Sequence, residues 1–233
     1  MKKFEKFLNV KKKSRIILAL DIDPRIPIKT ILSKTKGLIA GVKIGIPYII
    51  LHGKERIKEI IEQFREDYLF IADLKLADIG FVSEILIDMM YKIGFDAIIS
   101  HGFIGMKGAL EDIKNRCDQL GMELFVIVAM SHPGAEELLN KNVDKIIRMA
   151  KHLGIRGFIA PATMPKYITL LRKEFGKNAT ILSPGIGAQG APVGSAIKNG
   201  ADFEIIGRRI ILSSNPLEEI KSIKSKHVEL GLL

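Results

Sequence analysis

The charged residues with the most informative spacing lie in a hexapeptide, Asp-Leu-Lys-Leu-Ala-Asp, that begins at Asp73. It follows an apolar run, LFIA (69–72), that is typical of a buried strand. Because successive side chains of a strand point to opposite faces, Asp73 and Lys75 are expected to share a face and Leu74 to point away. Lys and Asp are rarely buried unless they are paired. Together with Asp78, these residues predict the charged centre of an active site.

Two further charged residues are expected at the same place. The apolar runs RIILAL (15–20) and LIAGV (38–42) lead into Asp21 and Lys43. If Lys43 lies on a neighbouring strand, a second ammonium comes close to the Asp73 carboxylate. The alternative is an ion-pair plug that only closes the end of a barrel. We favour a catalytic site, because a plug needs neither so many charges at strand ends nor glycine-rich loops beside them.

A different chemistry is indicated by SPGIGAQG (183–190) and GRR (207–209). Glycine lets the backbone approach an anion closely, and the guanidinium of Arg208 offers a fork of donors that matches a phosphate. Loops after the last two strands of a barrel commonly bind phosphate. Glycine-rich turns also occur without a ligand, but the pairing of both loops favours a phosphorylated one. The stretch from Pro184 to Gly194 is long enough to close as a lid. The glycines concerned are Gly185, Gly187, Gly190 and Gly207.

The histidines do not form a metal-binding pattern. His101 and His132 each follow an apolar run, but the sequence contains neither HxH nor HExxH. We therefore expect supporting or structural roles for both histidines and no metal site. Asp23 is either a second inward carboxylate or the start of a turn at Pro24.

Eight short apolar runs, each followed by a loop and most by an amphipathic stretch, position these residues. Alternating strands and helices predict a parallel sheet, and nearly continuous apolar strands predict that both of its faces are buried. Eight units fit a single-domain (β/α)8 TIM-type barrel spanning residues 1–233. An open six-strand dinucleotide-binding sheet would want a GxGxxG after the first strand, which RIILALDIDPR lacks. The strands are expected at 15–21, 38–44, 69–75, 95–100, 124–130, 157–162, 179–185 and 203–207, with helical patterns at 55–64, 82–93, 135–153 and 164–175.

Composition narrows the class of protein further. The net charge of +10 suits either an anionic ligand or simply a lysine-rich, solvated surface, and we favour the second. The sequence has no Trp and few aromatic residues, so a nucleic-acid site built on stacking is not expected. Cys117 is the only cysteine, which excludes an internal disulfide. No apolar run has the length of a membrane span or a signal peptide. We expect a cytoplasmic protein.

The motifs together resemble one enzyme family. The hexapeptide at Asp73 is similar to the DxKxxD signature of the orotidine 5′-monophosphate decarboxylase superfamily. The motifs around it resemble the orotidine decarboxylases themselves, in their archaeal form, and run in order from about residue 15 to Pro216. They are LALD (18–21), VKIG (42–45), HGF (101–103), MSHPGA (130–135), APAT (160–163), SPGIGAQG (183–190) and IGRR (206–209).

The resemblance implies a role for each charged residue. Lys75 would donate a proton to carbon 6 of the pyrimidine after carbon dioxide leaves. Asp73 would lie against the departing carboxylate, between Lys43 and Lys75. Asp78 would reach across a homodimer interface into the partner's site and, with Asp21 and Lys43, bind the ribose hydroxyls. The implied activity is the decarboxylation of orotidine 5′-monophosphate to uridine 5′-monophosphate, without a cofactor, in de novo pyrimidine biosynthesis.

The resemblance also implies the contacts that bind the substrate. Ser131 would recognise the pyrimidine edge, and Gln189 would bridge the base and the phosphate from the lid. Gly207 and Arg208 would hold the phosphate. The expected binding set is therefore Asp21, Lys43, Ser131, Pro184, Gly185, Gln189, Gly207 and Arg208.

Two departures and two rival functions remain open. Val82 and Met164 stand where relatives usually carry Thr and Arg, so a polar contact is in doubt at each position. One rival is a Mg²⁺-dependent sugar-phosphate decarboxylase or synthase of the same superfamily, such as 3-keto-L-gulonate 6-phosphate decarboxylase. It would need an acid near the position of Lys43. The other rival is a non-catalytic barrel that binds nucleotides or nucleic acids.

Overall fold

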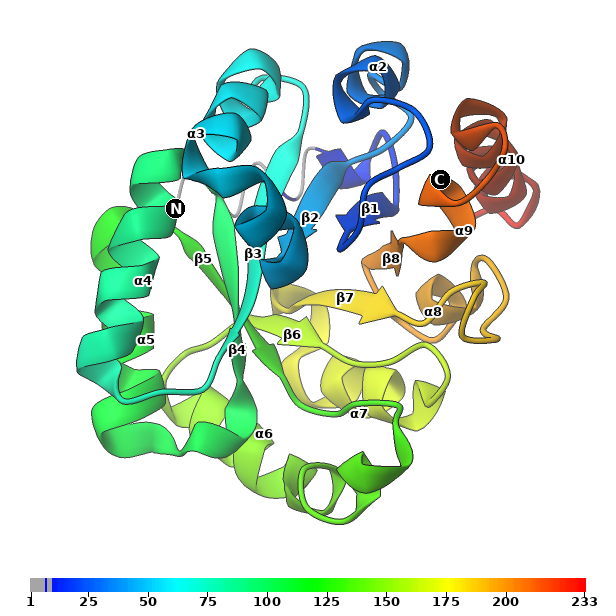
Figure 1. Ribbon diagram of the computed structural model, residues 1–233. Helices are drawn as coiled ribbons and strands as arrows, with labels where there is room; N and C mark the ends of the chain where they lie inside the picture. Colours follow the sequence, from blue (N-terminus) through cyan, green and yellow to red (C-terminus); the bar gives the residue numbers. More distant parts are fainter. Residues whose placement is uncertain (1–6, 8–9) are drawn as a thin grey trace.

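The computed structural model describes Phe7 and residues 10–233. In this part of the chain, eight parallel strands pair in sequence order, and β8 pairs with β1 to close a barrel surrounded by helices (Figure 1). The expectation of a (β/α)8 barrel is confirmed. The strands are β1 Ile16–Leu20, β2 Gly41–Gly45, β3 Leu69–Leu76, β4 Ala97–His101, β5 Glu123–Ile127, β6 Gly157–Ile159, β7 Thr180–Pro184 and β8 Phe203–Ile206.

The helices differ more from the expected ranges than the strands do. The expected helix at 135–153 is wrong in its first part, where short 3-10 turns at Pro133–Glu136 and Asn140–Asn142 precede α6. The pattern at 55–64 belongs to a longer helix that kinks at Gly53, whose φ is 72°. The helices are α2 Ile28–Lys34, α3 Ile46–Phe64, α4 Gly80–Ile93, α5 Glu111–Leu120, α6 Val143–His152, α7 Pro165–Phe175, α8 Ser195–Lys198, α9 Arg208–Ile211 and α10 Pro216–Glu229.

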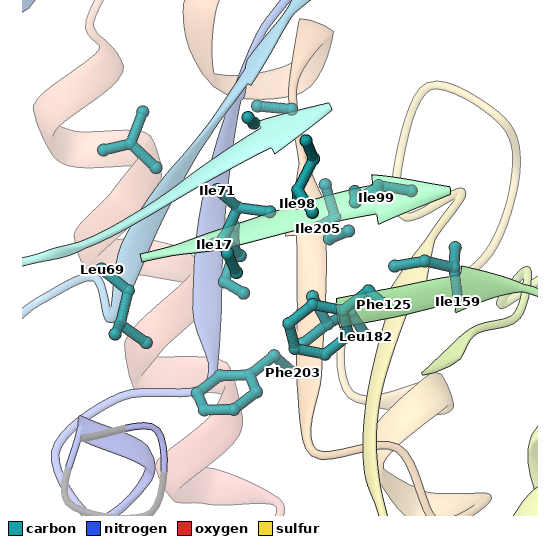
Figure 2. Packing of buried hydrophobic residues seen from close by; sticks show 14 of the residues in the cluster. Ile17, Leu69, Ile71, Ile98, Ile99, Phe125, Ile159, Leu182, Phe203 and Ile205 are labelled. Carbon is teal, nitrogen blue, oxygen red and sulfur yellow. The ribbon is translucent and has the colours of Figure 1, made fainter. Parts of the chain in front are cut away.

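Large apolar side chains fill the barrel interior in layers (Figure 2). Ile99, Ile159 and Ile205 form the layer next to the cavity described below and line it. Gly41 of β2 faces β3 so closely that a Cβ there would lie 2.6 Å from the carbonyl oxygen of Leu69, which only glycine avoids. The interior is therefore a packed core beneath a polar mouth.

Phe7 closes the amino-terminal end of the barrel. Its side chain is 1% exposed, and its ring centroid lies 5.3 Å from that of Phe125 and 6.3 Å from that of Phe203. Phe203 is the first residue of β8, and Phe125 lies in the middle of β5. The functional chemistry is thus confined to the carboxyl ends of the strands.

No helix in the described part of the chain combines the length and the apolar character needed to cross a membrane.

Candidate active site

A cavity of about 270 Å³ opens at the carboxyl ends of the strands. Of the residues to which the family resemblance assigns a catalytic or binding role, all but Asp78 line it. They are Asp21, Lys43, Asp73, Lys75, Ser131, Pro184, Gly185, Gln189, Gly207 and Arg208. Apolar side chains from the barrel core form its floor. Segments that are far apart in the sequence thus meet at one mouth, as parallel strands in a closed barrel require.

Four charges of alternating sign form the centre of this cavity. The Lys43 Nζ donates to Asp21 Oδ1 at 2.9 Å and to Asp73 Oδ2 at 2.7 Å. The Lys75 Nζ donates to both carboxylate oxygens of Asp73, each at 2.9 Å. Lys43 and Asp73 are each 5% exposed. The row Asp21–Lys43–Asp73–Lys75 is therefore a preorganised array in which each buried charge has an opposite neighbour.

The pKa values of the two buried members show how strongly the pairing acts. Burial alone would lower the pKa of Lys43, but Asp73 and Asp21 outweigh it and raise that pKa above its ordinary value. Burial alone would raise the pKa of Asp73, but Lys43 and Lys75 hold it below its usual range. Both groups are therefore charged around neutral pH.

The backbone at Lys75 is unusual. Its φ is 48°, the one positive value among the described non-glycine residues, and the pairing of β3 with β4 shifts register between Ala72 and Leu76. Strand alternation predicted that Asp73 and Lys75 point the same way, and their side chains do meet. The Lys75 side chain reaches Asp73 from a backbone in the left-handed region, within an irregular part of β3. Such strain costs on the order of 1–3 kcal/mol and is commonly found at functional sites.

The glycine-rich segment after β7 borders the opposite side of the cavity. Ile186 and Ala191 pair across a tight turn, and the Gly187 N–H donates to the Ala191 carbonyl at 2.9 Å. Gly185 and Gly187 have φ of 108° and 75°, conformations that disfavour other residues. Gln189 stands exposed at the tip of this turn. The segment can thus present backbone and one amide side chain to a ligand.

The loop after β5 is held by a residue that the sequence analysis missed. Asn140 is 6% exposed, and its side chain accepts from the Met130 N–H at 3.1 Å and donates to the Met130 carbonyl at 3.0 Å. It also donates to Glu136 Oε1 at 2.8 Å. Met130 and Ser131 both line the cavity. An asparagine within a sequence that looked helical gave no signal of this role.

Asp78 lies outside the cavity within this chain. Its carboxylate is exposed and accepts the N–H of Ile79 at 2.7 Å. Ser83, which follows Val82, is buried, and its hydroxyl donates to the Asp78 carbonyl at 3.3 Å. Asp78 therefore does not join Asp73 and Lys75 within one chain, where the charged cluster consists of Asp21, Lys43, Asp73 and Lys75.

The remaining candidates are not among the residues that line the cavity. His101 is partly buried at the end of β4, and burial together with nearby Lys75 lowers its pKa. His132 is exposed. Asp23 is also exposed and pairs with His52 at 2.7 Å, so it is not an inward carboxylate. Met164, in place of an arginine, lies with its sulfur 3.9 Å from the Asn140 amide nitrogen.

The donor set at the mouth suits an ammonium better than a metal. Among the described residues, no group of three or more His, Cys, Asp or Glu side chains is placed to hold a metal ion. Asp21 and Asp73 could supply two oxygen ligands, but the Lys43 ammonium lies between them and bonds to both. A divalent cation there would be repelled by that charge.

A closed (β/α)8 barrel with paired buried charges at its mouth and a glycine-rich loop beside them has the architecture of a barrel enzyme. Comparisons with known proteins specify the family. Residues 14–223 match the model of the "Orotidine 5'-phosphate decarboxylase / HUMPS family". The chain belongs to this family.

Its relatives include archaeal enzymes. The chain is 38% identical over 213 residues to the orotidine 5′-phosphate decarboxylase of Aeropyrum pernix, covering 90% of this chain and 86% of that protein. It is 40% identical over 208 residues to that of Pyrococcus furiosus, covering 89% and 95%.

Solved structures agree with the sequence comparison. The crystal structure of orotidine 5′-monophosphate decarboxylase from Sulfolobus solfataricus has a TM-score of 0.85 at 32% identity, with 95% of this chain and 100% of that chain covered. The enzyme from Methanocaldococcus jannaschii, complexed with the inhibitor BMP, has a TM-score of 0.81 at 31% identity, with 91% and 98% covered.

Proposed function

We propose that this protein decarboxylates orotidine 5′-monophosphate to uridine 5′-monophosphate, a step of pyrimidine biosynthesis. The observation that carries the proposal is the position of Asp73, held between the ammonium groups of Lys43 and Lys75 in the cavity of a chain that belongs to this family. The reaction breaks the bond between carbon 6 and the carboxylate. The electron pair stays on carbon 6, and a proton replaces the carbon dioxide that leaves.

Lys75 is the proposed proton donor. The carbanion at carbon 6 lies in the plane of the ring and has no adjacent carbonyl to delocalise it, so its stabilisation must be electrostatic. Two unit charges about 4 Å apart interact by roughly 4 kcal/mol at an effective dielectric near 20. A fixed ammonium is therefore a large but partial contributor. After protonation of carbon 6, the amine of Lys75 recovers its proton from solvent through the open mouth.

Asp73 has two proposed effects. It holds the Lys75 ammonium through both of its oxygens, which fixes the donor before the substrate arrives. Its negative charge also lies close to where the substrate carboxylate would sit, and the loss of carbon dioxide removes that repulsion. Lys43, bonded to both Asp21 and Asp73, connects this centre to the proposed ribose site.

The remaining contacts are proposed to bind the ends of the nucleotide. Ser131 would contact the pyrimidine edge, while Gly207 and Arg208 would hold the phosphate with Pro184, Gly185 and Gln189. Phosphate binding, remote from carbon 6, can drive closure of the loop and offset the cost of assembling charges in a dry site. Because the bound nucleotide supplies this energy, we propose that no cofactor is needed.

We further propose that the active enzyme is a homodimer in which Asp78 completes the partner's site. Asp78 is followed directly by apolar residues that face solvent in the single chain: Ile79 is 61% exposed and Phe81 is 71% exposed. The first turns of α3 add Ile50 and Leu51, at 78% and 64%. Segments after β2 and β3 stand side by side at one edge of the barrel. An apolar surface of this kind is typical of a contact between subunits.

One assay tests the proposed activity. Purified protein is mixed with orotidine 5′-monophosphate in excess EDTA, and loss of the orotate absorbance is followed. We expect turnover without added metal. Turnover only with added Mg²⁺, or no turnover, would favour the two rival functions, the sugar-phosphate branch of the superfamily and a non-catalytic binding protein. We place the activity in the cytoplasm, where this nucleotide would be made.

A further inference from the structure

A pair of titratable side chains in contact with each other is completely buried outside the active site. Glu204 of β8 and His227 of α10 are each 0% exposed, and Glu204 Oε2 lies 2.9 Å from His227 Nε2. Ile205 points into the cavity, so Glu204, next to it on the strand, points outward toward the helices. Burying such a pair seldom adds stability over apolar packing. A positional role is therefore the better explanation for it.

The Glu204 carboxylate also binds the end of the glycine-rich loop. Oε2 accepts the N–H of Gly194 at 3.0 Å, and Oε1 accepts the N–H of Ala196 at 3.1 Å. The other end of this loop continues from β7 at Pro184. Both ends of the segment that carries Gln189 are thus attached to the barrel, one covalently through a strand and the other through a single carboxylate.

The residues after α10 and the short helix α9 contact the same loop at other points. A Cβ added to Gly194 would lie 2.5 Å from Leu230 Cδ1 and 3.0 Å from Leu232 Cδ1. A Cβ at Gly187 would lie 2.6 Å from Arg209 Cδ, and Arg209 is paired with Glu219 of α10. Figure 1 shows α8, α9 and α10 grouped on one side of the barrel. The residues that follow α10 therefore pack against Gly194, and Arg209 of α9, which pairs with α10, packs against Gly187.

We propose that Glu204 and His227 form a positioning pair through which α10 holds the phosphate-binding loop ready for the substrate. The inference rests on the proposed function, because it takes that loop as the phosphate site. Neither residue lines the cavity, so the pair acts by fixing the Gly194 and Ala196 amides. A loop fixed at both ends loses less freedom when it closes on the phosphate.

The test uses two variants that disturb the pair differently. His227→Leu removes the side chain that holds Glu204, and Glu204→Gln keeps the volume but has a single oxygen to accept two amide protons. The inhibition constants of uridine 5′-monophosphate and of uridine are measured against the decarboxylation reaction. We expect the constant for the nucleotide to rise about three- to tenfold, what weakening one hydrogen bond can produce. The constant for uridine, which has no phosphate, should not change.

Amide hydrogen exchange of Gly194 and Ala196 in the free protein gives a readout independent of activity. Both variants are expected to speed it, while the exposed controls His152→Leu and Glu229→Gln leave both measurements unchanged. Equal changes for nucleotide and nucleoside, or unaltered amide exchange in a folded variant, would overturn the proposal. If one variant does not fold, the other decides. If wild-type protein shows no decarboxylation, the proposed function fails, and amide exchange alone then judges the pair.

Discussion

Lys75 donates to both carboxylate oxygens of Asp73 at 2.9 Å, although its own backbone is in the left-handed region with φ of 48°. In a regular strand, the pairing of β3 with β4 would continue past Lys75, but here its register shifts between Ala72 and Leu76. The chain thus accepts local strain to bring a donor back onto the carboxylate that precedes it by two residues. This arrangement is the basis of the first prediction.

Lys75→Ala is expected to abolish turnover, because Lys75 is the proposed proton donor to carbon 6. Loss of orotate absorbance measures it. Lys145→Ala, exposed on α6, is the matched control and should behave as the wild type. Near-normal turnover of the Lys75 variant would remove the lysine from the mechanism.

Arg208→Ala is expected mainly to raise KM. The guanidinium is exposed at the cavity rim and would contribute charge-assisted hydrogen bonds to the phosphate. Losing them should weaken binding by about 10- to 100-fold. Steady-state kinetics separate KM from kcat, with Arg148→Ala on α6 as the control. A loss confined to kcat would contradict the assignment of Arg208 to phosphate binding.

Asp78 gives a prediction about the dimer. Lys75→Ala and Asp78→Ala are each expected to be nearly inactive alone. If Asp78 serves the partner's site, a mixed dimer has one site with both native residues. Random exchange of subunits should then restore about a quarter of the wild-type sites in a symmetric dimer. Activity that stays at the level of the single variants after subunit exchange would place Asp78 in its own chain's site or outside catalysis.

Asn140→Ala is expected to disturb recognition of the base. It would leave the Met130 N–H and carbonyl unpaired, at a cost of about 1–3 kcal/mol for each group that stays buried. Thermal denaturation should show the loss of stability. Competitive binding should show weaker uridine 5′-monophosphate but unchanged ribose 5-phosphate. Asn142→Ala, whose side chain bonds only the Leu138 carbonyl among the described contacts, is the control. Equal weakening of both ligands would argue against a role specific to the base.

The charged centre should limit stability at both ends of the pH scale. The pKa of Asp73 in the folded protein is below its ordinary 3.8, so its contribution is present above that pH and is lost as the pH falls through the folded value. The pKa of Lys43 is above its ordinary 10.5, so its contribution is present below that pH and is lost as the pH rises through the folded value.

Denaturant titrations at several pH values check this. Asp73→Asn should reduce the loss of stability in acid, and Lys43→Met the loss in alkali. Asp144→Asn, at an exposed position on α6, should leave the loss of stability unchanged both in acid and in alkali. If Asp73→Asn loses as much stability in acid as the wild type, other carboxylates dominate the acid-induced loss of stability.

The sequence predicted the barrel and most of the site because both depend on short-range patterns. Apolar runs identified the strands, and the carboxyl end of each strand located the residues that line the cavity. The sequence could not predict the role of Asn140, because the periodicity had assigned its segment to a helix and its partner is the backbone of Met130, ten residues earlier. Glu204 was hidden within an apolar strand. Its partner His227 is 23 residues away, and such a contact exists only after the helices have packed.

The aromatic plug formed by Phe7, Phe125 and Phe203 has a consequence for the gas that the proposed reaction releases. Because the described part of the barrel interior is packed, we expect carbon dioxide to leave through the same cavity that admits the nucleotide. The carbon dioxide would leave either past the bound product or after the loop that carries Gln189 has opened. We therefore expect the release of both products to depend on opening of the loop that carries Gln189.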